Sequence, residues 1–321
     1  MLSAQTLPPS AFRSTHSTSS IKVTNLTKSY NEVKALGNIS FEIKKGELFG
    51  FIGPDGAGKT TLFRILTTLL IPDNGVVTVE GFDVVKDYKK LRKILGYMPG
   101  RFSLYQDLSV EENLKFYATI FDTTIEENYY LIKGIYSQIE PFKKRRAGKL
   151  SGGMKQKLAL SCAMIHKPEV LILDEPTTGV DAVSRKEFWE MLKKLKENGI
   201  TIVVSTPYMD EASLCDRVAL IESGRILDSE TPENIVKKFT RKLLAIKSNK
   251  MYELIHDLRE YNEAATVFPF GEYLHFTAKN NDINVDIIKK YLQEKNHDDI
   301  KIKEIIPNIE DCFIELTKKT S

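Results

Sequence analysis

One short segment constrains this chain more than any other, a glycine-rich loop that joins an apolar strand to a helix. Residues 53–60 read Gly-Pro-Asp-Gly-Ala-Gly-Lys-Thr and fit the pattern G-x-x-x-x-G-K-[ST]. The short run Glu47–Ile52 precedes the loop and a helical pattern over Thr61–Leu70 follows it, which is the context in which this pattern binds phosphate. Glycines let successive N–H groups turn toward an anion, and the helix N-terminus adds its positive end. The loop therefore predicts a nucleotide phosphate site.

Two side chains of this loop have chemical roles of their own. Lys59 supplies a positive charge to the β- and γ-phosphates, and the Thr60 hydroxyl is a ligand for Mg²⁺. The other loop positions act through their backbone. The candidate nucleotide contacts are Gly53, Pro54, Asp55, Gly56, Ala57, Gly58, Lys59, Thr60 and Thr61.

A second apolar strand, Val170–Leu173, ends in two acids, Asp174 and Glu175. An acid at the carboxyl end of a strand lies beside the ligand in an open α/β sheet. Asp174 is a candidate Mg²⁺ ligand, directly or through water, and Glu175 is a candidate catalytic residue that orients or deprotonates the attacking water. Many strands end in acids, but downstream of a phosphate loop this pair indicates nucleotide hydrolysis.

Strands alternate with helices along much of the chain. Strand-like runs cover Thr201–Val204 and Arg217–Ile221, and a helical pattern covers Ser184–Glu197. This alternation predicts an α/β fold with a parallel sheet covered on both faces. Residues near 88–165 read mostly as helices, which predicts a helical block inserted into the sheet domain.

The composition changes near Phe239. Residues 241–321 mix short strands with two helices, and we expect them to form a small separate α+β domain. Its expected strands are Lys242–Ile246, Tyr273–Thr277 and Ile300–Ile306, and its expected helices are Met251–Glu260 and Val285–Glu294. The predicted organisation is a disordered extension over 1–20, a nucleotide-binding domain over 21–238 and an accessory domain over 239–321.

Charge and hydropathy narrow the possible partners. The net charge of +3 is too small to indicate nucleic acid, and the basic cluster at 143–146 is typical of a solvated face. No apolar run approaches the roughly 20 residues of a membrane-spanning helix. The three cysteines are far apart and match neither metal nor redox spacing, so we expect buried or incidental thiols.

Leu150–Met154 reads Leu-Ser-Gly-Gly-Met and resembles the LSGGQ signature of ABC ATPases. Taken alone, Ser151 is also a normal helix N-cap. Its place upstream of Asp174 and Glu175 favours the signature. The resemblance covers about residues 21–238, with 174–177 and 178–181 similar to the Walker B segment and the D-loop. Residues 96–99 and 241–321 resemble daunorubicin-type and related ABC-2 exporters.

This resemblance implies a P-loop NTPase core of the ABC type with a helical subdomain, and ATP with Mg²⁺ as cofactors. Two nucleotide-binding domains would close around two ATP molecules, in a homodimer or a heterodimer. The residues implied at the nucleotide are Tyr30, which stacks on adenine, Ser151, Gly152 and Gly153, which contact the partner's γ-phosphate, and Asp181 of the D-loop. The implied partners are ABC-2 type transmembrane permease subunits, with this chain in the cytoplasm on the inner face of the membrane.

Three positions depart from the family pattern. Gly100 stands where a glutamine is usual, Pro207 where a histidine is usual, and Asp55 where an asparagine is commoner. Neither Gly100 nor Pro207 offers a side-chain donor, and losing one preorganised donor typically costs roughly 10²–10³ in rate. The chain is then either an ATPase that drives export or a degenerate ATP-binding subunit that completes a partner's site. A role on ribosomes or DNA fits less well, since the chain has one set of motifs and no sustained heptads.

Overall fold

The computed structural model describes residues 18–280 and 284–320, and within them the chain divides into two compact units. The first unit contains residues 18–47, 61–173 and 179–202, and the second contains 48–60, 174–178 and 203–320. The expected extension falls mostly on residues outside the described ranges. Ser19 and Ser20, the last two residues of the expected extension, lie at the start of the first strand. The boundary at residue 20 stays a prediction. The boundary near Phe239 stays a prediction.

An antiparallel sheet belongs to the first unit. Its strands are β1 (Ser19–Tyr30), β2 (Val33–Lys44), β4 (Asn74–Val79) and β5 (Phe82–Asp83), in the order β2-β1-β4-β5. β1 and β2 pair as one hairpin, from Ile21↔Ile43 to Tyr30↔Val33. β4 pairs antiparallel with the other side of β1, with Ile21 opposite Val79.

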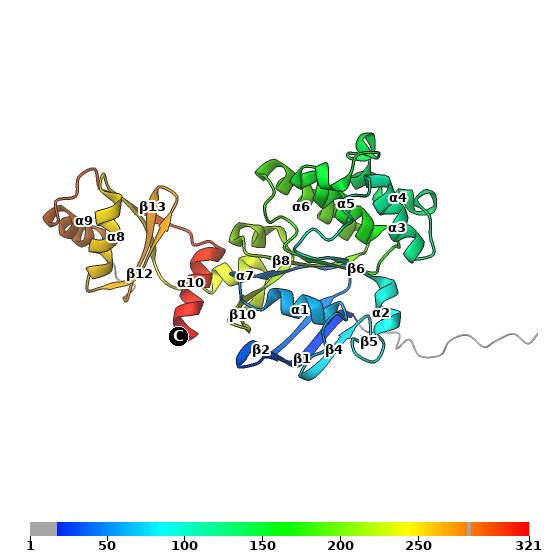
Figure 1. Ribbon diagram of the computed structural model, residues 1–321. Helices are drawn as coiled ribbons and strands as arrows, with labels where there is room; N and C mark the ends of the chain where they lie inside the picture. Colours follow the sequence, from blue (N-terminus) through cyan, green and yellow to red (C-terminus); the bar gives the residue numbers. More distant parts are fainter. Residues whose placement is uncertain (1–17, 281–283, 321) are drawn as a thin grey trace, which may run out of the picture. The chain divides into compact units, whose positions relative to one another are not determined.

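The helical block of the first unit confirms the expectation for residues 88–165. Its elements are α2 (Tyr88–Ile94), α3 (Val110–Ile120), α4 (Ile125–Tyr136), α5 (Gly152–Met164) and the short 3₁₀ turns η1 (Glu140–Phe142) and η2 (Ala147–Lys149). Capping boxes at Ser109 and Thr124 start α3 and α4. Both helices pack against α5 (Figure 1).

One strand interrupts this block. β6 (Leu95–Met98) pairs in parallel with β7 (Val170–Asp174), with Leu95 opposite Val170. This strand within the mostly helical residues 88–165 was not predicted from the sequence. The helix α6 (Ala182–Glu197) follows β7 as expected and carries Asp181 as its N-cap.

The phosphate-loop strand lies in the second unit. β3 (Leu48–Ile52) is parallel to β9 (Arg217–Glu222), and β10 (Arg225–Glu230) returns antiparallel to β9. Parallel pairing at both β3–β9 and β6–β7 confirms the parallel α/β sheet. Three elements have residues in both units, β7, β8 (Thr201–Thr206) and α1 (Lys59–Leu66). α1 is shorter than expected, because Thr68 adopts the left-handed conformation with φ 63°.

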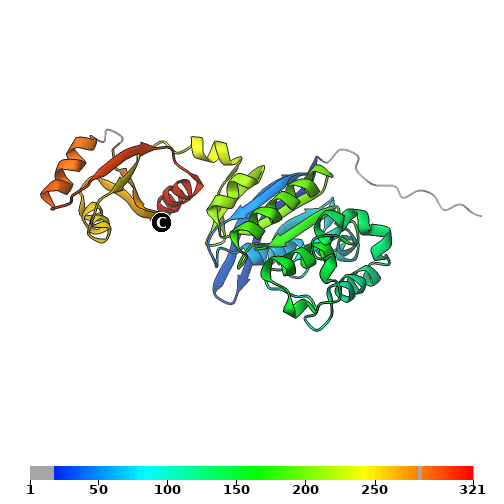
Figure 2. The ribbon, with the colours of Figure 1, turned by 90° about the horizontal axis from the view of Figure 1, so that it is seen from above.

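The C-terminal part of the second unit is a small α+β domain, as expected (Figures 1 and 2). Its elements are β11 (Leu243–Lys247), α8 (Met251–Glu260), β12 (Ala264–Phe270), β13 (Tyr273–Ala278), α9 (Val285–Glu294) and β14 (Lys301–Ile305). The antiparallel strand order β12-β13-β11-β14 and the β-α-β-β-α-β succession are those of a ferredoxin-like fold. Leu244 and Phe276 pack against Leu254 and Leu292 in its core.

Three further helical elements belong to this unit. They are η3 (Met209–Leu214), α7 (Pro232–Lys237) and α10 (Ile309–Thr320), and α10 packs against the other two. Throughout the described residues, every helix is too short or too polar to cross a membrane.

Candidate functional site

The loop between β3 and α1 has the backbone that phosphate binding requires. A Cβ atom at Gly53 would lie 2.0 Å from the Ile221 carbonyl oxygen, so only glycine fits between this loop and β9. Gly58 adopts φ 103°, a conformation that L side chains rarely reach. The Gly53 N–H donates to the Thr206 carbonyl at 3.3 Å, and Gly224 N donates to the Ala57 carbonyl at 3.0 Å. The loop is therefore fixed on both sides by backbone contacts.

Lys59 is folded back into this loop. Its side chain is 3% exposed, and its ammonium donates to the Gly53 carbonyl at 2.7 Å and to the Pro54 carbonyl at 2.9 Å. The same Nζ lies 3.3 Å from Glu175 Oε1. The structure thus brings the expected phosphate-binding cation and the expected catalytic acid together, as an ion pair. Thr60 is exposed beside them at the start of α1.

Both acids at the end of β7 are held by one hydroxyl. Asp174 is 2% exposed, and its Oδ1 accepts a 2.6 Å hydrogen bond from the Ser205 hydroxyl. The Ser205 hydroxyl also accepts from the backbone N–H of Glu175 at 2.9 Å. Ser205, which is fully buried, therefore connects the expected metal ligand to the expected catalytic residue.

Glu175 has an unusual backbone. Its φ of 50° lies in the left-handed region, which costs a residue with a side chain of order 1–3 kcal/mol and persists only where surrounding contacts hold it. Next to it, the Thr177 hydroxyl donates to the buried Glu211 carboxylate at 2.9 Å. These contacts fix the loop after β7, in which Glu175 lies.

Sequence reasoning missed Ser205 and the Thr177–Glu211 pair. Ser205 does have a signal in the sequence, because it follows the apolar run Ile202–Val204 just as Asp174 follows Val170–Leu173. Two buried strands that each end in a polar residue predict side chains at one edge of a parallel sheet. Glu211 lacks such a signal, since an acid in a short polar segment is most often exposed.

The expected signature segment lies in the first unit. Ser151 is the N-cap of α5 and accepts from Met154 N at 3.4 Å, while Gly152 and Gly153 form the first turn. A Cβ atom at Gly153 would lie 2.6 Å from Ser184 Oγ, so this turn packs tightly on the start of α6. The capping role is confirmed, and the exposed Ser151 and Gly152 remain candidates for contact with a partner's phosphate.

The remaining expected contacts, Asp181 and Tyr30, also lie in the first unit. The Asp181 carboxylate accepts from Ser184 N at 3.0 Å, and hydrogen bonds from the Ser184 backbone and side chain hold its pKa below the usual value. Tyr30 ends β1 with 44% of its surface exposed. An exposed aromatic face at a strand end is available for stacking, as the adenine role requires.

Gly100 and Pro207 follow β6 and β8 respectively. Gly100 is exposed, whereas Pro207 sits in a turn in which Tyr208 N donates to Thr206 Oγ1 at 3.0 Å. Because proline has no N–H, this turn offers no backbone donor at residue 207.

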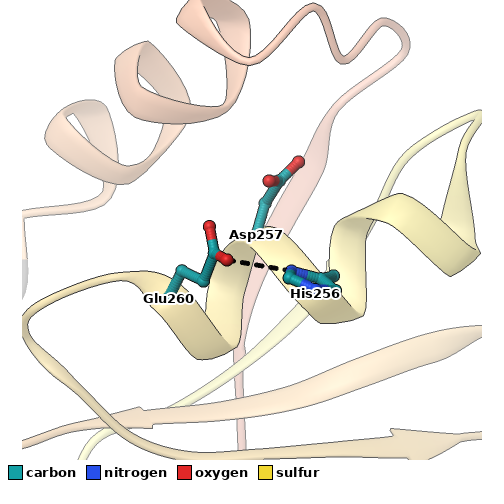
Figure 3. Close-up of side chains that lie close together, drawn as sticks. All are labelled: His256, Asp257 and Glu260. Atoms are coloured by element: carbon teal, nitrogen blue, oxygen red, sulfur yellow. Dashed lines mark ion pairs between the residues drawn. The ribbon is translucent and has the colours of Figure 1, made fainter.

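A second group of possible metal ligands lies far along the chain, on α8. His256, Asp257 and Glu260 come from this one helix, and His256 Nδ1 lies 3.3 Å from Glu260 Oε1 (Figure 3). Both acids already face a cation, because Lys295 Nζ lies 3.3 Å from Asp257 and 3.6 Å from Glu260. His297 Nε2 also contacts Asp257 at 2.9 Å. We therefore assign this group to the stability of the C-terminal domain.

Comparison with known proteins gives consistent matches. A family model described as ABC transporter matches residues 36–178, which include the phosphate loop, the Ser151–Gly153 segment and both acids. The chain is 38% identical over 286 residues to the "Probable multidrug ABC transporter ATP-binding protein YbhF" of Escherichia coli (strain K12). That alignment covers 88% of this chain and 49% of the relative, so this chain spans about half the relative's length.

Two further matches extend over most of the matched protein. The chain is 33% identical over 302 residues to the "Nod factor export ATP-binding protein I" of Rhizobium sp. (strain N33), covering 92% of this chain and 96% of the relative. Among solved structures, it is similar to the dimeric structure of a post-hydrolysis state of the ATP-binding cassette MJ0796 bound to ADP and Pi. The TM-score is 0.60 at 27% identity, over 66% of this chain and 98% of that one.

Proposed function

Because this chain belongs to the family of ABC transporter ATP-binding proteins, we propose that it is the ATP-binding subunit of an export complex. ATP binding and hydrolysis by this subunit drive transport through separate membrane subunits of the ABC-2 permease type. The names of two relatives, a multidrug transporter protein and a Nod factor export protein, support export as the direction of transport. The proposal implies a position at the inner face of the cell membrane, where a dimer of ATP-binding domains meets its permease partners.

The observation that carries this proposal is the Lys59–Glu175 ion pair inside the phosphate loop. Phosphate oxygens of ATP are the stronger anionic partner for a lysine at this position, because the loop also presents N–H groups and the α1 N-terminus. Phosphate at Lys59 would take over the contact that Glu175 now makes. The freed carboxylate can then orient a water molecule or accept its proton.

The residues present also fit a magnesium ion. The exposed Thr60 hydroxyl and the Asp174 carboxylate offer oxygen donors, which Mg²⁺ prefers. When bound, Mg²⁺ neutralises charge on the phosphate oxygens. Ser205 occupies Asp174 Oδ1 with a hydrogen bond, which leaves Oδ2 of this carboxylate to face the ion or its water.

The dimer is the second element of the proposal. The exposed Ser151 and Gly152 at the start of α5 present a hydroxyl and a helix N-terminus, which suit a phosphate held by a second ATP-binding domain. The similarity to a cassette solved as a dimer supports this arrangement.

A second candidate function rests on Gly100 and Pro207. Without donors at these positions, the chain would bind ATP but hydrolyse it slowly, and would complete the active site of a partner ATPase in a heterodimer. The intact phosphate loop and the intact Ser151–Gly153 segment both support this candidate.

Hydrolysis of Mg-ATP by the purified chain, beside its Glu175→Gln variant, tests the first candidate, with ATP binding followed in parallel. Turnover that the variant abolishes supports an ATPase subunit. Tight ATP binding with turnover no higher than the variant's supports the degenerate subunit. In that case the double substitution Gly100→Gln and Pro207→His, which supplies the two missing side chains, should raise turnover roughly a hundredfold. Failure to bind ATP at all would contradict both candidates.

A further inference from the structure

A recess outside the phosphate-loop site lies within the second unit, bordered by η3, α7, the start of α10 and the end of β12. It encloses about 570 Å³, within the range of roughly 300–1,000 Å³ typical of small-molecule pockets. Its apolar wall includes Met209, Val236, Phe270 and Ile309. Phe270 is 39% exposed, so part of its ring is accessible to a ligand.

The walls of this recess are held together by specific contacts. α10 packs against both η3 and α7, and the Cys312 thiol contacts the Ile235 carbonyl at 3.8 Å. A buried contact of 2.7 Å between His275 Nδ1 and Asp311 Oδ1 fixes α10 to β13. Phe270 stacks on the His275 ring with 4.3 Å between centroids. The recess is therefore framed by packed elements.

The charge of the lining is negative. Three carboxylates, Asp210, Glu233 and Glu310, border the recess, with Lys237 as its one lining ammonium. Within residues 18–280 and 284–320, the salt bridges that the structure forms include none of these three acids. Burial, then the neighbouring charges of Asp311 and Asp210, raise the pKa of Glu310. Asp210 and Glu310 line the same recess, so their negative charges repel each other and a cation between them would relieve that repulsion.

We propose that this recess binds an amphipathic organic cation, with its apolar body against Met209, Val236 and Phe270 and its charged nitrogen beside Asp210 and Glu310. An apolar pocket with a few convergent polar groups is the usual form of a small-molecule site. The aromatic face of Phe270 adds to the attraction for a cation. An anion of the same size would meet uncompensated carboxylates.

Occupancy of the recess is linked to the nucleotide site through η3. This short helix follows directly on Thr206–Tyr208, where Tyr208 N donates to Thr206 Oγ1. The Thr206 carbonyl in turn accepts from Gly53 N of the phosphate loop at 3.3 Å. A ligand that shifts η3 therefore acts on the phosphate loop through two hydrogen bonds. This linkage, unlike the binding itself, rests on the proposed function.

Fluorescence anisotropy of rhodamine 6G, an amphipathic cation, with the full chain and no nucleotide tests the binding. We expect saturable binding that high salt weakens and that the anionic dye 1-anilinonaphthalene-8-sulfonate does not displace. Asp210→Asn combined with Glu310→Gln should weaken binding at least about tenfold, because charge-assisted contacts are lost. Val236→Trp, which fills the recess, should abolish it.

Glu294→Gln, which removes an exposed acid of α9, is the matched control and should bind the dye like the natural chain. Unchanged affinity in both recess variants, or displacement by the anionic dye, would overturn the proposal. ATP affinity is then measured with and without saturating dye, where a change of about fivefold or more is expected. Equal ATP affinities would refute the linkage, while a chain that binds the dye but not ATP would refute only the proposed function.

Discussion

Replacing Ser205 with alanine tests whether one buried hydroxyl positions both acids of the site. The substitution removes the 2.6 Å bond to Asp174 Oδ1 and the 2.9 Å bond from Glu175 N. Glu175 N keeps its 3.1 Å bond to the Ser205 carbonyl. The substitution therefore affects mainly Asp174, a buried carboxylate that loses the hydrogen bond from the Ser205 hydroxyl.

The magnitude follows from the type of bond. A hydrogen bond to a charged group contributes about 1.5–3 kcal/mol, and about 1.4 kcal/mol corresponds to a tenfold change in affinity. If Asp174 helps to hold Mg²⁺, misplacing it should weaken the Mg²⁺-dependent part of ATP binding roughly tenfold to a hundredfold. ATP binding in EDTA, which depends on Lys59 and the loop backbone, should change less than about twofold.

Titration with a fluorescent ATP analogue, with Mg²⁺ and with EDTA, measures both quantities and does not require turnover. Ser161→Ala is the matched control, because Ser161 is as deeply buried as Ser205 and its hydroxyl donates to the Lys157 carbonyl of its own helix. Equal losses in Mg²⁺ and EDTA would indicate a general distortion of the loop and would refute the positioning role. So would a Mg²⁺-dependent affinity that matches the natural chain.

Three further predictions follow from single positions. Lys59→Met should weaken ATP binding roughly tenfold to a hundredfold, while the exposed Lys193→Met should not, as the same titration measures. Gly53→Ala should lower the melting temperature, because its Cβ would lie 2.0 Å from a carbonyl oxygen. Gly134→Ala in α4, where a Cβ atom meets no neighbour, should instead stabilise the chain by roughly 0.5–1 kcal/mol. A higher melting temperature for Gly53→Ala than for Gly134→Ala would contradict this backbone geometry. Burial raises the pKa of Cys312 to about 12 and that of Cys162 still further, so the fraction of thiolate at these two residues is very small at pH 8. Because Cys162, Cys215 and Cys312 are all buried, a thiol reagent should label them only after denaturation. Labelling of the folded chain would refute this prediction.

Local patterns in the sequence were sufficient for much of the fold and the site. The phosphate loop, Asp174 at the end of β7 and Glu175 after it can be predicted because each motif requires particular residues next to one another in the chain. α8 and α9 were predicted at the bounds that the structure has, Met251–Glu260 and Val285–Glu294, since their apolar residues repeat with a helical period over ten residues.

The missed elements depend on contacts distant in sequence. β6 is four residues long and contains Gly96. A Cβ atom added at Gly96 would lie 2.5 Å from the Ala163 carbonyl oxygen of α5, so the strand packs closely on this helix. A four-residue run has no measurable period, so only its pairing with β7 identifies it as a strand. Likewise Ser205 and Asp174 are 31 residues apart, and the sequence does not show that they share a hydrogen bond.

The departures at Gly100 and Pro207 divide the groups of this site into two sets. The groups proposed to bind the nucleotide, which are the loop backbone, Lys59 and the Ser205–Asp174 pair, are all present and connected by short contacts. Gly100 has no side chain to position Mg²⁺ or water, Pro207 has no donor for the γ-phosphate, and Thr206 Oγ1 already accepts from Tyr208 N across the proline turn. Ground-state binding depends on the first set, whereas turnover depends on donors placed where charge develops in the transition state. ATP affinity and turnover should therefore separate in this chain, and the ratio between them, more than either value alone, decides between the two proposed functions.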